Sequence, residues 1–216
     1  MSHYFENDNN LVSEIRPYNI CINEANFNFN TDNGVFSKGE LDFGTYLLIK
    51  NVLKLNICGS VLDLGCGYGP IGIILKKLLN VTVTMSDINN RAIHLSKMNA
   101  KKNNVLVNVI SSDGFDNISD TFDYIISNPP IRVGKKKLYE LLINSKNHLR
   151  KSGELIIVIR KEQGALSLIK DMNIYYNVKV IDKEKGFFII SLKKWLTIVL
   201  VCAINISWRH IISYNM

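Results

Sequence analysis

A short segment in the first half of the chain has the residue types of a nucleotide-binding loop. It reads, in order, Val61, Leu62, Asp63, Leu64, Gly65, Cys66, Gly67, Tyr68, Gly69 and Pro70. Glycines permit positive φ angles and let a ligand approach the backbone closely, and amides at a helix start can hold a polar or anionic group. An ordinary tight turn between a strand and a helix is the competing interpretation.

The spacing of the glycines argues against a nicotinamide cofactor. The dinucleotide fingerprint requires a third glycine three positions after the second, and Pro70 occupies that position. Asp63, just before the loop, is placed to orient loop amides or to accept a hydrogen bond from a ligand ammonium group. Both features favour S-adenosylmethionine as the cofactor. We expect it to contact Asp63 and the loop residues Gly65, Cys66, Gly67 and Gly69.

Two further acidic residues follow predicted strands and can extend a nucleoside site. Asp87 comes about 20 residues after the glycines, where a carboxylate can accept hydrogen bonds from both ribose hydroxyls. Asp113 follows the next strand, where it can accept from an adenine amino group. Taken alone, each aspartate is equally natural as a helix cap or a turn residue. Because three polar loops occur in succession, we expect cofactor contacts at Asp87, Ile88, Asp113 and Gly114.

The residues Asn128, Pro129 and Pro130 directly follow a fourth predicted strand and predict the reaction centre. Open α/β sheets bind ligands at the carboxyl ends of their strands. The amide oxygen of Asn128 and a backbone carbonyl of the proline-stiffened loop can both accept hydrogen bonds from one NH2 group. Such contacts direct the nitrogen lone pair at a methyl donor, and proximity supplies much of the acceleration without a strong base. We expect all three residues to be catalytic and Asn128 also to contact the cofactor; an ordinary Asn-Pro turn is the alternative.

Basic residues follow this motif at once. Arg132, Lys135, Lys136 and Lys137 lie just beyond Ile131 and place positive charge beside the predicted pocket. Cations at a helix start oppose the helix dipole, so an external anion such as an RNA backbone explains them better than a solvated helix start does. We expect Ile131, Arg132, Lys135 and Lys136 to contact the substrate.

Alternating strand-like and helix-like patterns predict the elements that position these loops. Strands are expected at residues 60–64, 81–86, 107–111, 122–127, 154–160, 176–182 and 186–193, and helices at 42–53, 69–79, 89–102, 136–149 and 163–172. Right-handed crossovers make this an α/β fold with a Rossmann-like, doubly wound, mostly parallel seven-stranded sheet. The last two strands are expected to form a C-terminal antiparallel hairpin, and residues 18–29 a small N-terminal β element.

The bulk properties fit one basic globular domain. The chain has 216 residues, with 26 lysines and arginines against 19 acids, and a formal charge of +7. This balance suits a polyanionic partner but does not identify one. The four cysteines show no paired spacing, so we expect neither a zinc site nor a disulfide framework, no metal, and a cytoplasmic location. The polar N-terminus does not indicate a secretory signal.

Two segments make up the predicted domain organisation. Residues 1–194 form the domain, and residues 195–216 form a hydrophobic C-terminal tail of unknown role. The tail's apolar run is shorter than the roughly 20 residues that span a bilayer. A packed terminal strand or helix is favoured over a membrane-associating tail, and a membrane partner is not expected.

With these motifs assembled, the chain resembles class I S-adenosylmethionine-dependent methyltransferases, and within them the ribosomal RNA small-subunit methyltransferase C-like family, which methylates guanine N2. Besides the glycine loop and the Asn-Pro-Pro motif, the resemblance rests on residues 34–37 (GVFS), 42–45 (DFGT), 160–165 (RKEQGA) and 185–188 (KGFF). It implies S-adenosylmethionine as cofactor and ribosomal small-subunit RNA as partner, with Ser37 on the substrate side. It also implies roles for Gly65, Gly67, Asp87 and Asp113 toward the cofactor and for Asn128 and Pro129 toward the target amine.

One departure leaves other substrates open. Many amino-methyltransferases place an aromatic residue after Asn-Pro-Pro, whereas this chain has Ile131, which offers only an aliphatic face to a flipped base. Methylation of an adenine in nucleic acid or of a protein glutamine is therefore an alternative. A noncatalytic RNA-binding or ribosome-assembly module with the same fold is another.

Overall fold

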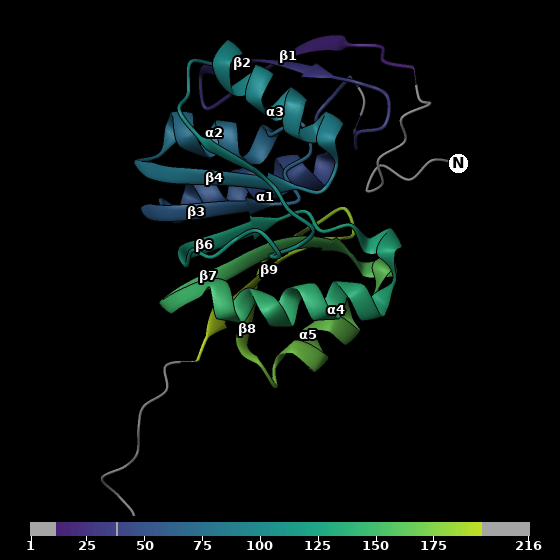
Figure 1. Cartoon of the computed structure of the whole chain (residues 1–216). Coiled ribbons are helices and arrows are strands. Elements are labelled where there is room, and N and C mark those ends of the chain that lie inside the picture. Colours follow the sequence, from purple (N-terminus) through teal and green to yellow (C-terminus); the bar gives the residue numbers. More distant parts are fainter. Residues whose placement is uncertain (1–11, 38, 196–216) are drawn as a thin grey trace, which may run out of the picture.

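A seven-stranded sheet forms the centre of the molecule. A computed structural model of the chain describes residues 12–37 and 39–195 (Figure 1). The strands of this sheet are β3 (Gly59–Leu64), β4 (Val81–Asp87), β5 (Asn108–Ser111), β6 (Phe122–Ser127), β7 (Leu149–Arg160), β8 (Tyr176–Glu184) and β9 (Phe187–Lys194). Their order across the sheet is β5-β4-β3-β6-β7-β9-β8. Neighbouring strands are parallel except around β9, which runs antiparallel to both β7 and β8. The predicted fold class and the C-terminal hairpin are confirmed.

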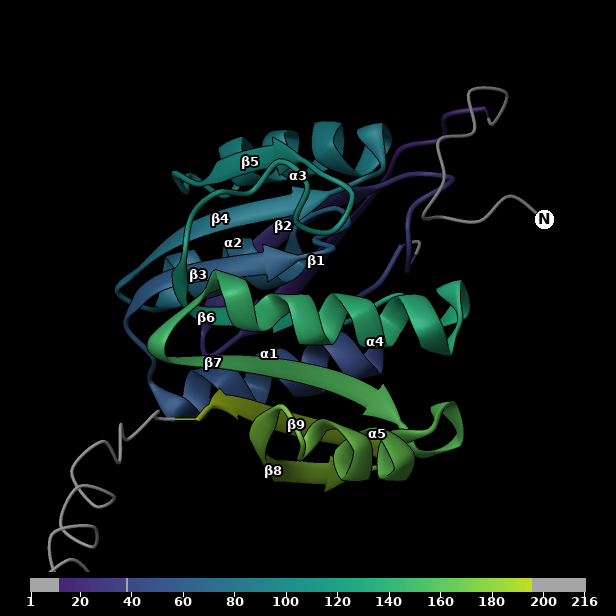
Figure 2. The same ribbon diagram turned by 60° about the horizontal axis from the view of Figure 1, so that its bottom comes forward.

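Helices cover both faces of this sheet (Figure 2). The α-helices are α1 (Phe43–Leu55), α2 (Pro70–Leu78), α3 (Asn90–Lys102), α4 (Lys135–Asn144) and α5 (Ala165–Met172), and the short 3-10 helices are η1 (Ile131–Val133), η2 (Ser145–His148) and η3 (Lys161–Gln163). In Figure 2 α4 and α5 lie in front of the sheet, and α1 and α2 lie behind it. Strands covered on both faces bury successive side chains, which explains the continuous hydrophobic runs in the central strands β3, β6, β7 and β9.

Alternating side chains of each strand divide the core into two layers. On β3, Val61 packs with α1, α2 and α3, whereas Leu62 packs with α4 and α5. On β7, Ile156 belongs to the first layer and Ile157 to the second. This alternation follows from the period of two in a β-strand, so the two helical layers are specified by one strand sequence.

The predicted N-terminal β element is a separate two-stranded antiparallel sheet. It consists of β1 (Arg16–Ile22) and β2 (Ala25–Thr31), and it packs beside α3. Asn99 on α3 and Asn103, the C-cap residue of α3, each form two hydrogen bonds with the backbone of β2. The Asn99 amide pairs with N and O of Asn30 at 2.8 and 2.9 Å, and that of Asn103 pairs with N and O of Asn28 at 2.9 and 2.8 Å. The helix thereby covers one edge of the hairpin.

The two largest differences from the predicted boundaries occur between α4 and β7. The helix expected at residues 136–149 ends at Asn144, and β7 begins at Leu149 rather than at Glu154. Leu149 fits the helical apolar pattern, but it pairs with Phe122 of β6 before the register shifts. The shift is tight, because a Cβ on Gly153 would lie 3.0 Å from the carbonyl oxygen of Phe122. Local periodicity cannot reveal such a bulge, because the partner strand lies outside the segment.

The predicted tail, residues 195–216, lies outside the described residues except for the exposed Trp195. None of the helices formed by residues 12–37 and 39–195 combines the length and the apolar character that a bilayer crossing requires.

Candidate functional site

The glycine loop sits at the carboxyl edge of the sheet and is fastened to the neighbouring strand β4. The amides of Gly65 and Cys66 both donate to the carbonyl oxygen of Ser86, at 2.9 and 2.8 Å. The amide of Gly67 donates to the carboxylate of Asp87 at 2.8 Å. The loop after β3 and the end of β4 therefore form one unit, because the last two residues of β4 accept the hydrogen bonds of the loop.

The outer loops join this unit on either side. The amide of Ser112, after β5, donates to the carbonyl oxygen of Asp87 at 3.0 Å. The hydroxyl of Ser127, at the end of β6, donates to the carbonyl oxygen of Leu64 at 2.7 Å. Strands β5, β4, β3 and β6 are consecutive in the sheet. The structure thus brings together all four loops that the sequence singled out, along the edge at which open α/β sheets bind ligands.

The three loop glycines differ in what surrounds them. Gly65, Gly67 and Gly69 have φ angles of 72°, 56° and 91°, which a residue with a side chain rarely adopts. An added Cβ would meet nothing within 4 Å at Gly65 or Gly67, so open space lies over these two residues. At Gly69 it would lie 3.2 Å from the Cβ of Ser96 on α3. Gly65 and Gly67 can line a ligand, whereas close packing explains Gly69.

Asp63 lies beneath the loop with an incomplete set of partners. Its carboxylate is fully buried, and Oδ2 accepts a hydrogen bond from the amide of Gly72 on α2 at 2.9 Å. Its Oδ1 has no hydrogen-bond partner within the described part of the chain. Burial, together with the negative charge of Asp87, raises the pKa of Asp63 to about 7. A buried acceptor of this kind is unfavourable unless a donor reaches it, so the site fits a ligand that carries an ammonium group.

Asp87 presents a half-buried carboxylate at the end of β4. Oδ1 accepts from the amide of Asn89 at 2.9 Å, while Oδ2 holds Gly67. Burial raises the pKa of Asp87. Each carboxylate oxygen has a second lone pair, so the side chain can still accept from a pair of hydroxyls. The neighbouring Ile88 is also half-buried.

The loop after β5 is more exposed than the loops beside it. Asp113 is exposed, and Gly114 is half-buried with a φ angle of 51°. The next residue, Phe115, is buried and stacks on His148 with their ring centroids 4.2 Å apart. This stack gives the loop a rigid base, while the carboxylate of Asp113 remains open to a ligand.

Asn128 is oriented by a residue to which the sequence prediction gave no role of its own. Its Nδ2 donates to the hydroxyl oxygen of Thr45 at 2.9 Å. Thr45 is buried in the first turn of α1, where Asp42 caps the helix by accepting from the amides of Gly44 and Thr45. Because Nδ2 is used in this way, the other end of the amide, Oδ1, is the acceptor presented to a substrate. The next residue, Pro129, is buried.

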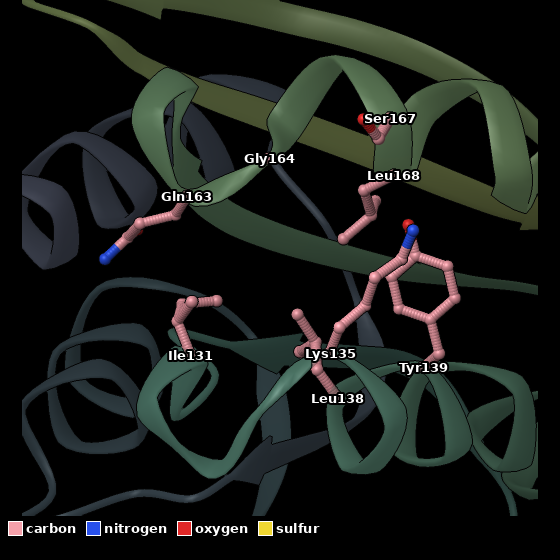
Figure 3. Close-up of a pocket in the computed structure, with 8 residues that line it drawn as sticks. All are labelled: Ile131, Lys135, Leu138, Tyr139, Gln163, Gly164, Ser167 and Leu168. Carbon is pink, nitrogen blue, oxygen red and sulfur yellow. The ribbon is translucent and has the colours of Figure 1, made fainter.

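The residues predicted to bind the substrate lie around η1 and α4. Ile131 and Lys135 face Gln163 and Leu168 of the opposite wall across a pocket of about 150 Å³ between α4 and α5 (Figure 3). Lys135 also pairs with Asp171 at 3.3 Å and lies 4.8 Å from the ring centroid of Tyr139. This cation is therefore partly neutralised. The side chains of Arg132, Lys136 and Lys137 in the same region are exposed.

Ser37 lies in a different neighbourhood from the other predicted substrate residues. It is half-buried with a φ angle of 57°, and its hydroxyl donates to the carbonyl oxygen of Glu40 at 2.5 Å. Its segment is held next to the Asp87 loop, because Asn89 donates to the carbonyl oxygen of Gly34 at 3.0 Å. No group of three or more potential metal ligands occurs among the residues that the structure describes.

The arrangement can hold a nucleoside beside an oriented amide acceptor. Open space over two glycines, a carboxylate for hydroxyls and a buried acceptor for an ammonium group match the parts of S-adenosylmethionine. The amide of Asn128 lies on the adjacent strand end, where it can hold an amino group against the cofactor. Such a pair of subsites can position two reactants for a direct transfer.

The chain is similar to several known proteins. The chain matches the methyltransferase small domain family over residues 26–191. It is 42% identical over 197 residues to the uncharacterized protein YbxB of Bacillus subtilis, covering 89% of this chain and 98% of that protein. It is 36% identical over 182 residues to ribosomal RNA small subunit methyltransferase C of Psychromonas ingrahamii, covering 82% of this chain and 51% of the relative.

A solved structure of similar fold extends this comparison. It is the 16S rRNA N2 G1207 methyltransferase of T. thermophilus in complex with AdoMet and guanosine, with a TM-score of 0.76 and 22% identity. The match covers 86% of this chain and 52% of that one. The chain thus spans about half the length of the methyltransferase C relatives it matches. It belongs to the methyltransferase small domain family of class I methyltransferases, which use S-adenosylmethionine.

Proposed function

We propose that this protein transfers a methyl group from S-adenosylmethionine to the exocyclic N2 of a guanine in small-subunit ribosomal RNA. The observation that carries the proposal is the hydrogen bond from Asn128 to Thr45, which fixes an amide acceptor beside the glycine loop. The relatives named as ribosomal RNA small subunit methyltransferases support the RNA substrate. The solved neighbour that holds guanosine supports the choice of base.

The chain's own residues supply orientation. Asn128 Oδ1 and the backbone carbonyl of Pro129 accept the two N–H bonds of the target amine. The nitrogen lone pair then points away from both acceptors, toward the cofactor side of the site. Pro130 stiffens the loop that holds this geometry. Bound S-adenosylmethionine supplies an electrophilic methyl group, so the site needs positioning more than it needs a strong base.

The cofactor is held by the three loops after β3, β4 and β5. Gly65, Cys66 and Gly67 line its amino-acid part, and Asp63 accepts from its ammonium group. Asp87 accepts from the ribose hydroxyls, with Ile88 against the base. Asp113, with Gly114, accepts from the adenine amino group. The open space over Gly65 and Gly67 supports these assignments. The unused lone pairs of Asp63 and Asp87 support them as well.

The RNA lies on the side of the site formed by η1 and α4. Ile131 packs against the target base, and Arg132 and Lys136 contact phosphates. Lys135 approaches the RNA from its position over Tyr139, and Ser37 contacts the substrate from the Asp87 side. The formal charge of +7 favours this polyanion. Such a substrate places the protein in the cytoplasm.

A transfer assay tests the proposal. The pure protein is incubated with methyl-labelled S-adenosylmethionine and naked small-subunit RNA, small subunits or whole ribosomes, and the nucleosides are then separated. We expect the label in N2-methylguanosine. Label in N6-methyladenosine or in methylglutamine would give the site another substrate, and no label in any arm would contradict methyl transfer.

Variants at the amide connect this activity to the site. Asn128→Ala should abolish transfer while S-adenosylmethionine still binds nearly normally, because the lost amide oxygen holds the amine and the loops after β3, β4 and β5 still hold the cofactor. Thr45→Val removes the partner of Nδ2 and should lower kcat by at least about tenfold, the effect of losing one buried hydrogen bond. Thr45→Ser keeps the hydroxyl and is the matched control. A fully active Asn128→Ala enzyme would exclude this reaction centre.

A further inference from the structure

Five side chains gather where α1 begins and β7 ends, and we call them the aromatic–cation cluster: Phe43, Tyr46, Arg160, Lys185 and Phe187. The ring centroids of Phe43 and Phe187 are 5.5 Å apart, and those of Phe43 and Tyr46 are 6.4 Å apart. The guanidinium carbon of Arg160 lies 4.4 Å from the Phe187 centroid, and Lys185 Nζ lies 4.6 Å from that of Phe43. Each cation thus lies over one ring of a continuous aromatic surface.

The cluster borders the proposed reaction centre. Thr45, which holds the amide of Asn128, lies in the same helical turn as Phe43 and Tyr46. On the sheet side, Ser127 of β6 pairs with Ile157, and β7 continues from there to Arg160 at the same carboxyl edge. An RNA whose target base reaches Asn128 therefore passes close to the cluster.

The cluster is built into the fold rather than formed by loose surface chains. Phe187 packs so closely on α1 that a Cβ on Gly44 would lie 2.6 Å from its Cε1. Arg160 and Phe187 are paired residues of β7 and β9. The rings therefore need little ordering when a ligand arrives, which favours binding.

The two cations of the cluster keep their charge available to a ligand. Arg160 and Lys185 are both exposed, and within residues 12–37 and 39–195 neither forms an ion pair with an acidic side chain. Lys135, in contrast, is paired with Asp171. An exposed cation over an aromatic ring still offers its N–H donors to an external anion.

We propose that the aromatic–cation cluster is a stacking platform for unpaired RNA nucleotides next to the methylated base. This inference rests on the proposed function. A base can stack on the outer plane of the Arg160 guanidinium, which in turn stacks on Phe187, while Lys185 contacts a neighbouring phosphate. The platform supplies the aromatic surface that Ile131 does not. Bases inside a duplex are already stacked on each other, so the preferred ligand is single-stranded.

Binding of a labelled RNA tests this platform without using methyl transfer as the readout. Fluorescence anisotropy is measured with a short single-stranded RNA containing one guanine, and with the same strand in a duplex, in the presence of S-adenosylhomocysteine. The double variant Arg160→Gln, Lys185→Gln should bind the single strand about tenfold or more weakly. Its affinity should also depend less on salt, with a slope smaller by about 0.7 for each phosphate that the variant no longer neutralises.

Matched variants separate stacking from charge and from folding. The double variant Lys97→Gln, Lys101→Gln removes the same charge from the exposed side of α3 and should bind as the wild type does. Phe187→Leu should lose about tenfold in affinity with an unchanged salt slope, and Phe187→Tyr, which keeps the ring, should bind as the wild type does. Stronger binding of the duplex, or equal affinity of the two double variants, would overturn the platform.

The failure of this inference and that of the proposed function are distinguishable. If the wild type methylates RNA and the cluster variants bind it normally, the function stands and the platform is wrong. If the cluster variants lose single-strand binding but the wild type methylates no RNA, the platform stands and the proposed reaction is wrong.

Discussion

At the scale of single residues, Asp63 couples the stability of the fold to pH. Its carboxyl group is fully buried with one oxygen unpartnered in the described structure, and burial raises its pKa to about 7 from an ordinary value of 3.8. Between pH 3.8 and about pH 7, the carboxyl group of Asp63 has lost its proton in the unfolded chain but retains it in the folded chain. The free energy of unfolding therefore falls as pH rises, until the folded pKa is passed, and then levels off.

Replacing this residue should remove that dependence. Asp63→Asn keeps an oxygen that can accept from the Gly72 amide but cannot titrate. From about pH 5 to about pH 7, the wild type should lose stability relative to the variant by about 1.4 kcal/mol per pH unit. Urea unfolding of both proteins without cofactor, at several pH values, measures this difference. Parallel pH profiles of the two proteins would contradict it.

The sequence singled out loops that the structure brings to one edge of the sheet, but it did not predict the contacts among them. Asp42 is recognisable as a helix cap, and the glycine spacing indicated a nucleoside loop. The role of Thr45 could not be predicted, because its partner Asn128 is 83 positions away and a hydroxyl in a helix has many possible partners. For the same reason the sequence did not show that Lys135 is paired with Asp171.

At the scale of elements, α3 acts as an additional partner for the edge of β2. Two residues four apart on a helix are about 6 Å apart along its axis, and two residues two apart on a strand are separated by about 6.8 Å. The amides of Asn99 and Asn103 can therefore meet the backbone of Asn30 and Asn28 in register. Asn99 also donates to the carbonyl oxygen of Tyr68 at 2.8 Å, so the hairpin, α3 and the glycine loop are connected.

Removing this buried amide should destabilise the fold. Asn99→Ala leaves three backbone groups without their partner and should lower the free energy of unfolding by about 1–3 kcal/mol. Urea denaturation measures the loss. Lys97→Ala, on the exposed face of the same helix, is the control and should change stability by no more than about 0.5 kcal/mol. Equal stability of the two variants would mean that water replaces the amide without penalty.

Periodicity predicted the existence and order of the elements but not every boundary. The helix predicted to reach residue 149 was too long. An apolar Leu149 fits the pattern of a helix and of a strand equally well, and its pairing with Phe122 depends on a strand outside the segment. The hairpin at residues 16–31 was predicted only as a small β element. Its position could not be predicted, because asparagines on a helix do not reveal which backbone they contact.

At the scale of the whole molecule, β9 holds the C-terminal part of the sheet together. It lies between β7 and β8 and buries Phe188, Ile189, Ile190 and Leu192. Each such side chain contributes about 1.5–3 kcal/mol, so together they rival the total stability of about 5–15 kcal/mol of a typical domain. Without β9, β8 has no neighbour in the sheet order.

Two shortened chains test this dependence. A protein that ends at Trp195 keeps every strand of the sheet and should retain the circular dichroism spectrum and cooperative unfolding of the described fold. A protein that ends at Lys185 lacks β9 and should lose cooperative unfolding. Cooperative unfolding of the shorter protein would show that β9 is dispensable.

The same strand order has a consequence during synthesis. A nascent chain that has reached Glu184 already contains β7, but the edge of β7 that β9 will cover is still open. Open strand edges with apolar flanks readily pair with other chains, so this stage is the most prone to aggregation. The edge stays open until residues 187–194 have left the ribosome and can pair with β7, so this interval sets how long the nascent chain depends on chaperones.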